Sequence, residues 1–451
     1  MPRRQSFDTS VPTVLVRLDR NPFHHGTLGA ARSLGRAGIP VHAVIESGTS
    51  PVARSRYLRS ARASPGPVST AELVTLLHRY ADEIGGAADG SPDTASAPLL
   101  VLPLDDVSAL GLARRRAELS PRFLLPEQTE EQLLRVADKA ALAETCASLG
   151  LPHPRTELPT GTDEAAAMAW SIGLPVVAKW SRPWLLPAGG GLRSTSIVRS
   201  LAEVRELYAR TPEAGSRLLL QELLPSGRDL DWFFHGYVDA DGGCTTGATG
   251  RKERSWPDGA GLTAVGRWTA NPAVDRTARD LFRALGYRGV CDLDFRLNPS
   301  TGAYHLLDFN PRPGAQFRLF ADPDGLDVVR ALHLDLTGCR VPPHAPVHGR
   351  RFVVENYAAL SYLTAPRRDP ADGPASRHGT GDAEEPLPTE YAWCAADDPA
   401  PALAMGLAWC GHLLRRAITA ARRYLTGRRA RPALSARAPR ARSSSRQLTP
   451  R

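Results

Sequence analysis

GVCDLDFRLNPSTGAYHLLDFNPRPGAQ, residues 289–316, is the stretch of this 451-residue chain that decides the fold. It predicts two strands joined by a turn at residues 298–302, because Asn, Pro, Ser, Thr and Gly gather there. Side chains alternate between the two faces of a strand, so the apolar ones are expected to share one face. These are Cys291, Leu293 and Phe295 on the first strand and Leu307 and Phe309 on the second.

Acidic and amide side chains make up the opposite face of this predicted hairpin. A central turn places Asp294 across from Asp308, and Asp292 across from Asn310. Directly opposed residues have Cβ atoms about 5 Å apart, where like charges destabilise a sheet unless a cation lies between them. Asp and Asn oxygens suit Mg2+, and Arg312 follows on the same face. Taken alone, these residues leave a second interpretation open, which is a solvated acidic edge.

The length of the chain and its 42% hydrophobic and 23% charged residues indicate a globular protein of two or three domains. No apolar run reaches the roughly 18 residues of a membrane span, and no apolar segment follows the basic N-terminus as in a secretory signal. The six cysteines are scattered without a CxxC pair or zinc spacing, which disfavours a disulfide framework. We therefore expect a cytoplasmic protein.

The net charge of +9 comes from the C-terminal tail. Twelve Arg and no acidic residue follow Asp398, so residues 1–398 carry 44 basic and 47 acidic side chains. The body thus lacks the basic footprint of a nucleic-acid-binding protein, and that interpretation depends on the tail alone. Lysine is rare, because only Lys139, Lys179 and Lys252 stand against 53 Arg. These three are candidates for positions that need a compact ammonium rather than a guanidinium.

The first part of the chain predicts alternating strands and helices. Strands at 13–18 and 41–45 enclose a helix at 28–37 and form a βαβ unit. A helix at 70–84 and a strand at 99–104 follow, separated by a loop rich in Ala, Gly, Ser and Asp. These elements predict a βαβ domain, and the turn before its first helix lacks the dinucleotide fingerprint.

Two acidic residues, Asp105 and Asp106, follow the last of these strands. Strand ends of a doubly wound sheet face the ligand crevice, but an Asp at such a position also commonly caps a helix. Both roles stay open from the sequence. His24 and His25, in the turn before the first helix, are expected to be loop or capping residues, because nothing near them completes a metal site.

A second module is predicted to begin near Glu127. A glycine-rich turn, Gly189–Gly191, offers backbone N–H groups without side-chain obstruction and could lie over phosphates, although flexible loops of this kind are common. The other predicted elements are a helix at 130–149, strands at 175–179, 194–199 and 217–224, a helix at 200–210, a polar β region at 231–267 and a helix at 273–285.

The sequence changes character beyond about Thr337. Residues 364–388 are rich in Pro, Gly and charge, and they predict a mobile loop. Residues 399–427 predict a helix with apolar residues on one side and Arg on the other. Packing of this helix against the body is favoured, with contact to anionic lipid as the alternative. From Arg428 onward the composition indicates disorder.

Seven short motifs follow one another in a fixed order. They are Asp138-Lys139, Pro175–Lys179, Gly189–Gly191, Gln221–Leu224, Arg251-Lys252, Asp294-Phe295 and Asp308-x-Asn310-x-Arg312. This ordered set resembles the ATP-grasp superfamily of carboxylate–amine or carboxylate–thiol ligases over about residues 127–340. Within that superfamily, the plan is most similar to the D-aspartate ligase type.

The resemblance implies an α/β fold of the α+β ATP-grasp kind in four parts. They are a Rossmann-like pre-ATP-grasp βαβ domain at 1–126, a two-subdomain ATP-grasp domain at 127–345, a C-terminal extension with a helix at 346–427 and a disordered Arg-rich tail at 428–451.

The resemblance also implies roles for individual residues. ATP would be held by Lys139 and Lys179 at the phosphates, by Gln221, Glu222, Leu223 and Leu224 at the adenine, by Asp229 (with Asp231 as the second choice) at the ribose, and by Gly190 and Gly191 in a lid. Mg2+ would be held by Asp294, Asp308 and Asn310, with two ions expected and Mn2+ as an alternative. The catalytic residues would be Arg312 at the acyl phosphate and Lys252, with Arg254 or Arg251, at the transferring phosphoryl group.

The function implied is that of an ATP- and Mg-dependent ligase. A substrate carboxylate attacks the γ-phosphate to give an acyl phosphate and ADP, and an amine then displaces phosphate and forms an amide. The alternatives are a thiol or another nucleophile in the second step, or an inactive nucleotide-binding regulatory protein. The partners would be a small-molecule carboxylate and an amine, without nucleic acid; the oligomeric state stays open, with a homodimer as one option.

Two departures from the pattern of the superfamily involve three positions. Asp294 and Asp308 stand where many relatives have at least one Glu, and Asp292 stands where some ligases have an Arg. The identity of the substrates is therefore not carried over from better-known members.

Overall fold

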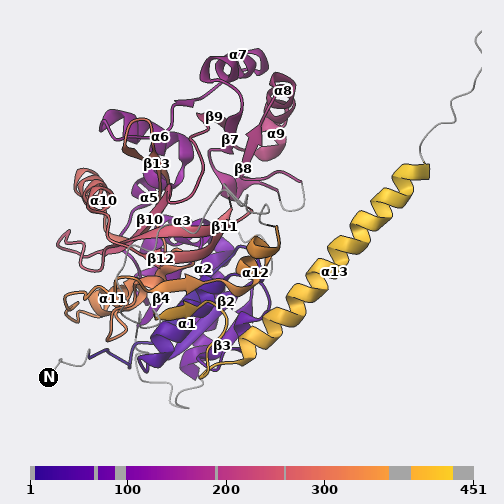
Figure 1. Ribbon diagram of the computed structural model, residues 1–451. Coiled ribbons are helices and arrows are strands. Elements are labelled where there is room, and N and C mark those ends of the chain that lie inside the picture. The colour runs from indigo at the N-terminus through magenta and orange to yellow at the C-terminus, as the bar shows by residue number, and fades with distance from the viewer. Residues whose placement is uncertain are drawn as a thin grey trace, which may run out of the picture. The chain divides into compact units, whose positions relative to one another are not determined.

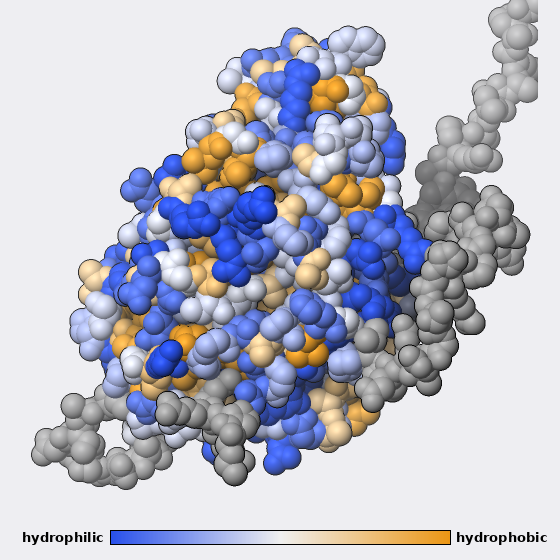
Figure 2. Space-filling model, turned by 60° about the vertical axis from the view of Figure 1, so that its left-hand side comes forward, coloured by the Kyte–Doolittle hydropathy of each residue, from blue (hydrophilic) through white to orange (hydrophobic). Residues whose placement is uncertain are grey.

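The computed structural model describes residues 6–64, 70–86, 98–187, 191–257, 261–364 and 388–429 (Figure 1). The chain divides into two compact units, residues 1–405, which we call the body, and residues 406–451. Hydrophilic side chains cover most of the face of the body seen in Figure 2, and apolar ones appear there in separate patches. The predicted loop at 364–388 and most of the predicted tail lie outside the described residues.

The first part of the body is a parallel five-stranded sheet in the order β3-β2-β1-β4-β5. This is the strand order of a Rossmann-like sheet, which confirms the predicted βαβ unit. Its strands are β1 (Thr13–Val16), β2 (Val41–Ile45), β3 (Leu58–Ala63), β4 (Leu99–Pro103) and β5 (Phe123–Leu124). Its helices are α1 (His25–Arg36), α2 (Thr70–Gly86), α3 (Asp106–Arg114) and α4 (Arg116–Leu119).

Side-chain caps fix the two helices that start at the carboxyl ends of the strands. His24 caps α1 by accepting the backbone N–H of Thr27, so the expected capping role is confirmed. Asp105 caps α3 through a capping box with Ser108. Its other carboxylate oxygen accepts the backbone N–H groups of Leu18 and Asp19, which ties the loop after β1 to the end of β4.

The helix predicted at 130–149 is two helices, α5 (Glu130–Ala137) and α6 (Lys139–Ser148). The break has a local cause, because Asp138 takes an extended conformation and its carboxylate accepts the backbone N–H groups of Ala140 and Ala141. Asp138 is thereby the N-cap of α6. Lys139 becomes the first residue of a helix rather than a residue in the middle of one.

The second sheet has four antiparallel strands in the order β6-β9-β7-β8. Together with its helices it lies at the end of the body away from α1 and β2 (Figure 1). Its strands are β6 (Thr156–Glu157), β7 (Val176–Trp180), β8 (Thr195–Val198) and β9 (Leu218–Glu222). Its helices are α7 (Thr162–Ile172), α8 (Leu201–Ala209) and α9 (Thr211–Ala214).

The third sheet has seven strands in the order β14-β13-β10-β11-β12-β15-β16. They are β10 (Asp231–Val238), β11 (Ala248–Trp256), β12 (Leu262–Trp268), β13 (Gly289–Asn298), β14 (Ala303–Asn310), β15 (Arg351–Val353) and β16 (Thr389–Tyr391). The helices of this part are α10 (Pro272–Leu285), α11 (Val328–Leu336) and α12 (Glu355–Thr364). Helix α11 and α1 contribute to one hydrophobic core, which joins this part to the first sheet.

The predicted C-terminal extension shares the third sheet. Strand β15 pairs with β12, and β16 pairs with β15, so the boundary predicted between residues 345 and 346 cuts across one sheet. The four-part domain division stays a prediction. Helix α13 (Ala400–Arg429) includes the predicted helix at 399–427 except its first residue, and the predicted start of the tail at Arg428 falls inside it. In the described part of the chain, no helix is long and apolar enough to cross a membrane.

The hairpin of β13 and β14 has the predicted register. Asp294 pairs with Asp308, and Asp292 pairs with Asn310. A bulge changes the apolar face, because Phe295 pairs with Leu306 and leaves Leu307 as an extra residue. The prediction that Leu307 shares the core face with Phe309 is therefore wrong: Leu306 packs in the core with Phe309, and Leu307 lines a cavity.

Candidate active site

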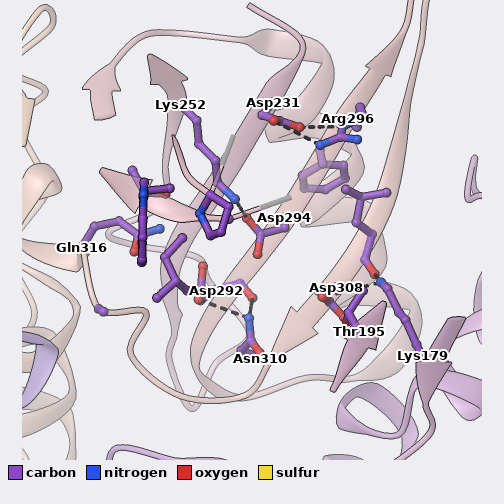
Figure 3. Close-up of a pocket in the computed structure, with 18 of the residues that line it drawn as sticks. Lys179, Thr195, Asp231, Lys252, Asp292, Asp294, Arg296, Asp308, Asn310 and Gln316 are labelled. Carbon is purple, nitrogen blue, oxygen red and sulfur yellow. Dashed lines mark hydrogen bonds and ion pairs between the residues drawn. The ribbon is translucent and has the colours of Figure 1, made fainter. Parts of the chain in front are cut away.

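One cavity of about 660 Å3 in the body brings most of the predicted site residues together. Its walls come from the second and third sheets and from the loops after β1 and β4, and the β13–β14 hairpin supplies its acidic floor (Figure 3). The predicted residues that line it are Lys179, Gln221, Glu222, Leu223, Leu224, Lys252, Asp294, Asp308, Asn310 and Arg312.

The end of β9 forms an apolar and amide-lined part of this cavity. Gln221 is oriented by its side-chain N–H, which donates to Oγ1 of Thr156 at 2.9 Å. The backbone of Glu222 donates to the carbonyl of Arg155 at 2.9 Å, so the strand end is held in place. The apolar side chains of Val177 and Ile197 line the same cavity. A flat heterocycle with hydrogen-bonding edges suits such a site.

Two of the three lysines converge on one carboxylate. The ammonium of Lys139 forms an ion pair with Oδ1 of Asp308, and that of Lys179 lies 3.7 Å from Oδ2. Lys179 also donates to the carbonyl of Leu307 at 3.0 Å. Burial alone would raise the pKa of Asp308, but the two ammonium groups outweigh it and lower the pKa to about 2. Lys139 does not itself line the cavity.

The third lysine, Lys252 on β11, lies 2.8 Å from Oδ1 of Asp294 (Figure 3). Burial raises the pKa of Asp294 despite this partner, and the neighbouring charges of Asp292 and Asp308 act in the same direction. The carboxylates of this floor therefore repel one another, as directly opposed acids in a sheet do. A bound cation would relieve that repulsion.

The donor set of the floor fits Mg2+. Asp294 and Asp308 face each other across the hairpin, and Asn310 adds an amide oxygen. In the described part of the chain, no cluster of three or more His, Cys, Asp or Glu side chains is arranged to hold a metal ion. Two carboxylates are nevertheless the usual protein contribution to a Mg2+ site, since water and substrate phosphates complete the octahedron.

Arg312 connects the hairpin to the first sheet. Its Nε donates to Oδ1 of Asp106 on α3 at 3.1 Å, and Nη2 donates to Oδ1 of Asn310 at 3.3 Å. Of the two acidic residues after β4, Asp105 thus caps α3 and lines the cavity, whereas Asp106 holds Arg312. The guanidinium stands where the carboxyl ends of β1 and β4 meet the acidic floor.

A buried pair that was not predicted from the sequence lies behind the floor. His235 on β10 lies directly opposite Asp292, and its Nε2 is 3.0 Å from Oδ1 of that carboxylate. The other oxygen of Asp292 accepts the side-chain N–H of Asn310 at 3.2 Å (Figure 3). Burial works against the charge of Asp292, but His235, Arg312 and Lys252 together outweigh it and lower the pKa of this carboxyl. A lone His in the otherwise mostly apolar strand DWFFHGYV was the available signal.

Asp229, Arg254 and Gly191 were also predicted, but they do not line the cavity. Asp229 pairs with Arg251 at 3.0 Å. Asp231, the second choice for the ribose, does line the cavity and binds Arg296 at 2.6 Å. Arg254 turns toward α12. Gly191 is described but does not line the cavity, and Gly190 lies outside the described residues.

Arg254 holds a helix rather than the acidic floor. Its guanidinium donates to Oγ of Ser361 at 3.0 Å and to the carbonyl of Ser361 at 2.9 Å. It also lies 4.1 Å from the ring centroid of Tyr362. These contacts fix α12 against β11. They occupy the side chain that was expected at the transferring phosphoryl group.

Comparisons with known proteins were made for the sequence and for the fold. No family model matches the chain. The D-aspartate ligase of Enterococcus faecium is 22% identical over 240 residues, which are 51% of this chain and 57% of that ligase. The chain thus spans little more than half the length of that relative. The N-terminal section of the carbamoyl phosphate synthase large chain of Methanopyrus kandleri is 24% identical over 44% of this chain and 36% of its own length.

Solved structures show the fold. The L-amino acid ligase from Bacillus licheniformis matches with a TM-score of 0.54 and 12% identity over 76% of this chain and 79% of its own. The biotin carboxylase from Campylobacter jejuni matches with a TM-score of 0.53 and 14% identity over 74% and 72%. Both are ATP-grasp proteins. The chain therefore has the ATP-grasp fold that the ordered motifs predicted.

Proposed function

We propose that this chain is an ATP- and Mg-dependent ligase that activates a substrate carboxylate as an acyl phosphate and joins it to an amine. One observation carries the proposal. The facing carboxylates of Asp294 and Asp308, each paired with a lysine, form the floor of a cavity that also contains the strand end at Gln221–Leu224. The relatives named ligases add support to it.

ATP fits this cavity by charge and shape. The side of Gln221–Leu224 would take the adenine between apolar walls, and Asp231, which lines the cavity, is placed better than Asp229 for the ribose hydroxyls. The three ammonium groups of Lys139, Lys179 and Lys252 lie within ion-pair distance of the two facing carboxylates. Together with bound Mg2+, they would neutralise the triphosphate, since phosphoryl transfer depends mainly on positioning and charge neutralisation.

Asp294, Asp308 and Asn310 would hold Mg2+, and we propose two ions, with Mn2+ as a substitute. Mg2+ in such a site neutralises phosphate charge and orients the phosphates. If these carboxylates bound the metal, Lys139, Lys179 and Lys252 would be available to contact phosphate oxygens. The lysines and carboxylates would thus hold each other in place until the nucleotide binds.

The reaction balances in two steps. A carboxylate oxygen of the substrate attacks the γ-phosphorus, the bond to the bridging oxygen breaks, and ADP leaves. The amine nitrogen then attacks the acyl carbon, the bond to the phosphate oxygen breaks, and the nitrogen loses a proton. Arg312 is placed to orient the carboxylate and to stabilise the acyl phosphate, for which its planar fork is suited.

The test uses hydroxylamine as a general amine. The full chain is supplied with ATP, Mg2+ and pools of carboxylic and amino acids, and ADP, phosphate and hydroxamate are measured. At least one pool should give ADP and hydroxamate in equal amounts. Nucleotide binding without ADP release from any pool would favour a regulatory protein. Turnover with thiols but not with amines would instead move the second step to another nucleophile.

A further inference from the structure

We propose that the acid activated by this chain is a monocarboxylic acid with an aromatic or bulky apolar group, and that this group lies against Phe23, Trp256 and Tyr357. The inference rests on the proposed function, because it names the substrate class of the same site. It comes from a part of the cavity that none of the predicted nucleotide or metal residues uses.

This part of the lining, which we call the aromatic wall, comes from three separate places in the chain and consists of Phe23, His25, Trp256 and Tyr357. Phe23 lies in the loop between β1 and α1, and His25 is the first residue of α1. Trp256 is the last residue of β11, and Tyr357 lies in the first turn of α12. Phe23 and Tyr357 are each 7% exposed, so their rings are held within the fold rather than extended into solvent.

The rings of His25, Trp256 and Tyr357 hold one another in a fixed arrangement. Trp256 and Tyr357 stack with an interplanar angle of 12° and centroids 6.0 Å apart. Tyr357 meets His25 edge-on at 6.5 Å, and His25 lies 5.9 Å from Phe352 on the adjoining strand. A preformed aromatic wall loses little conformational freedom on binding, and it favours flat or bulky apolar groups over small polar ones.

The wall carries no positive charge at neutral pH. Burial lowers the pKa of His25 to about 4 and lowers that of His24 well below its ordinary value, so both rings are neutral. Arg254 offers no cation here, since it is bound to Ser361 and does not line the cavity. A second carboxylate on the substrate would find no partner among these side chains.

The remaining charges also disfavour a second carboxylate. The described cavity-lining residues include four cations, and Lys179, Lys252 and Arg296 each lie within ion-pair distance of an acid of the nucleotide and metal parts. The fourth, Arg312, is needed for the carboxylate that reacts. Asp19 and Asp105, in contrast, line the same cavity and would repel a dicarboxylate.

The experiment compares matched acids with the full chain, MgATP and hydroxylamine. The aromatic acids are 3-phenylpropanoate and both enantiomers of phenylalanine, and the dicarboxylates are succinate and both enantiomers of aspartate. We expect kcat/KM for hydroxamate formation to be at least about tenfold higher with an aromatic acid, as apolar pockets discriminate by such factors. Equal or faster turnover of a dicarboxylate would overturn the inference and leave the proposed function standing.

Variants locate the effect on the wall. Trp256→Ala should raise KM for the aromatic acid about tenfold or more without changing KM for ATP, and Trp256→Phe should restore most of the loss. The control is Trp170→Ala, because Trp170 lies on α7 with 73% of its surface exposed. An unchanged KM for the acid in Trp256→Ala contradicts the assignment. Should that variant not fold, Phe23→Leu tests the same wall.

Failure of the proposed function would be recognised separately. If no acid releases ADP, equilibrium dialysis of 3-phenylpropanoate in the presence of MgATP decides the inference alone. Binding that Trp256→Ala weakens at least about tenfold, with Trp170→Ala unaffected, supports an aromatic acid site without ligase chemistry. Absence of binding to the wild-type chain rejects the site.

Discussion

Asp308 is the residue on which the site depends most, because it opposes Asp294 and holds two lysines. Asp308→Asn should lower the rate of ADP formation by about 100-fold or more, since a metal-binding carboxylate stabilises the transition state by several kcal/mol. Asn is preferred to Ala, which would leave two buried ammonium groups beside a void. ADP release under saturating ATP measures the effect.

The matched control for this change is Asp163→Asn. The side chain of Asp163 lies on α7 with 96% exposure, so its substitution should leave turnover unaltered. A 100-fold loss in Asp308→Asn with a normal thermal unfolding curve would separate chemistry from folding. Near-normal turnover in that variant would remove Asp308 from the metal site.

Asp292 is predicted to position Asn310 rather than to bind metal itself. Asp292→Asn should raise the Mg2+ concentration for half-maximal activity by about 10- to 100-fold, the usual effect of losing a partner of a metal ligand. Gly314→Ala should act in the same direction, because a Cβ there would overlap Cε1 of His235 and Oδ2 of Asp292. An activity loss that added Mg2+ does not reverse would argue for a purely structural role.

His25 gives the body a pH-dependent stability whose sign follows from its burial. Burial lowers its pKa from 6.5 to about 4, so the unfolded chain takes up the proton at a higher pH than the folded chain does. This contribution is complete above pH 6.5 and is lost as the pH falls toward 4, by about 3 kcal/mol in total.

His25→Phe should remove that part of the slope. Urea unfolding at pH 7.5 and at pH 4.5 measures the free energy of unfolding of both proteins. Between these two pH values, the wild-type chain should lose more of this free energy than the variant does. Identical pH dependence of the two proteins would mean that His25 is already protonated in the folded state or that another group titrates in its place.

At the scale of single residues, the sequence was enough to predict the register of residues that lie within one short motif. Asp294, Asp308 and Asn310 follow from strand alternation and a turn, so their register was readable. Residues whose side-chain position depends on a partner far away in the sequence could not be placed in this way. Nothing local to Arg254 signals that it binds Ser361, and nothing local to Asp229 shows that Arg251 holds it.

Among the elements, the errors of prediction have specific backbone causes. The double leucine at 306–307 fits either face of β14, and only the pairing of Phe295 with Leu306 reveals the bulge. Residues 130–149 favour helix throughout, and the break at Asp138 arises from a side chain that caps the next helix. An Asp side chain can take up backbone N–H groups in this way and so interrupt a helix, but the composition of the segment gives little indication of it.

The segment between β16 and α13 joins the end of the body to its beginning. Asp398, 1% exposed, forms an ion pair with the fully buried Arg32 of α1 at 2.9 Å and also accepts a hydrogen bond from Ser55. Arg32 donates in addition to the carbonyls of Trp393 and Asp398. The segment after β16 is thus fixed to the first sheet by a buried network.

Asp398→Ala should lower the free energy of unfolding by about 3–5 kcal/mol, because it leaves the guanidinium of Arg32 buried without its carboxylate. The control is its neighbour, Asp397→Ala. Asp397 binds Arg36 with 42% of its side chain exposed, and such pairs contribute about 1 kcal/mol or less. Equal losses in the two variants, measured by urea unfolding, would contradict this account.

For the whole molecule, the order of motifs was enough to predict the fold, and the comparisons agree with it. Five of the seven motifs supply residues that line one cavity, namely those that contain Lys179, Gln221, Lys252, Asp294 and Asp308, and Lys139 of a sixth reaches Asp308 from the start of α6. The role of residues 346–405 was not predictable. Their contribution to the third sheet and to the aromatic wall depends on contacts with residues far earlier in the chain.

The last prediction concerns the second unit. Ending the chain after Gly411 should leave kcat and the KM for ATP unchanged, because every described residue that lines the cavity lies between 19 and 357. The cut keeps more than one turn of α13 beyond Met405, where the body ends.

Ending the chain after Pro388 should instead lower the melting temperature strongly, since β16 and Asp398 are lost together. If the chain that ends after Gly411 lost turnover while its melting temperature stayed unchanged, residues 412–451 would have a part in the reaction itself.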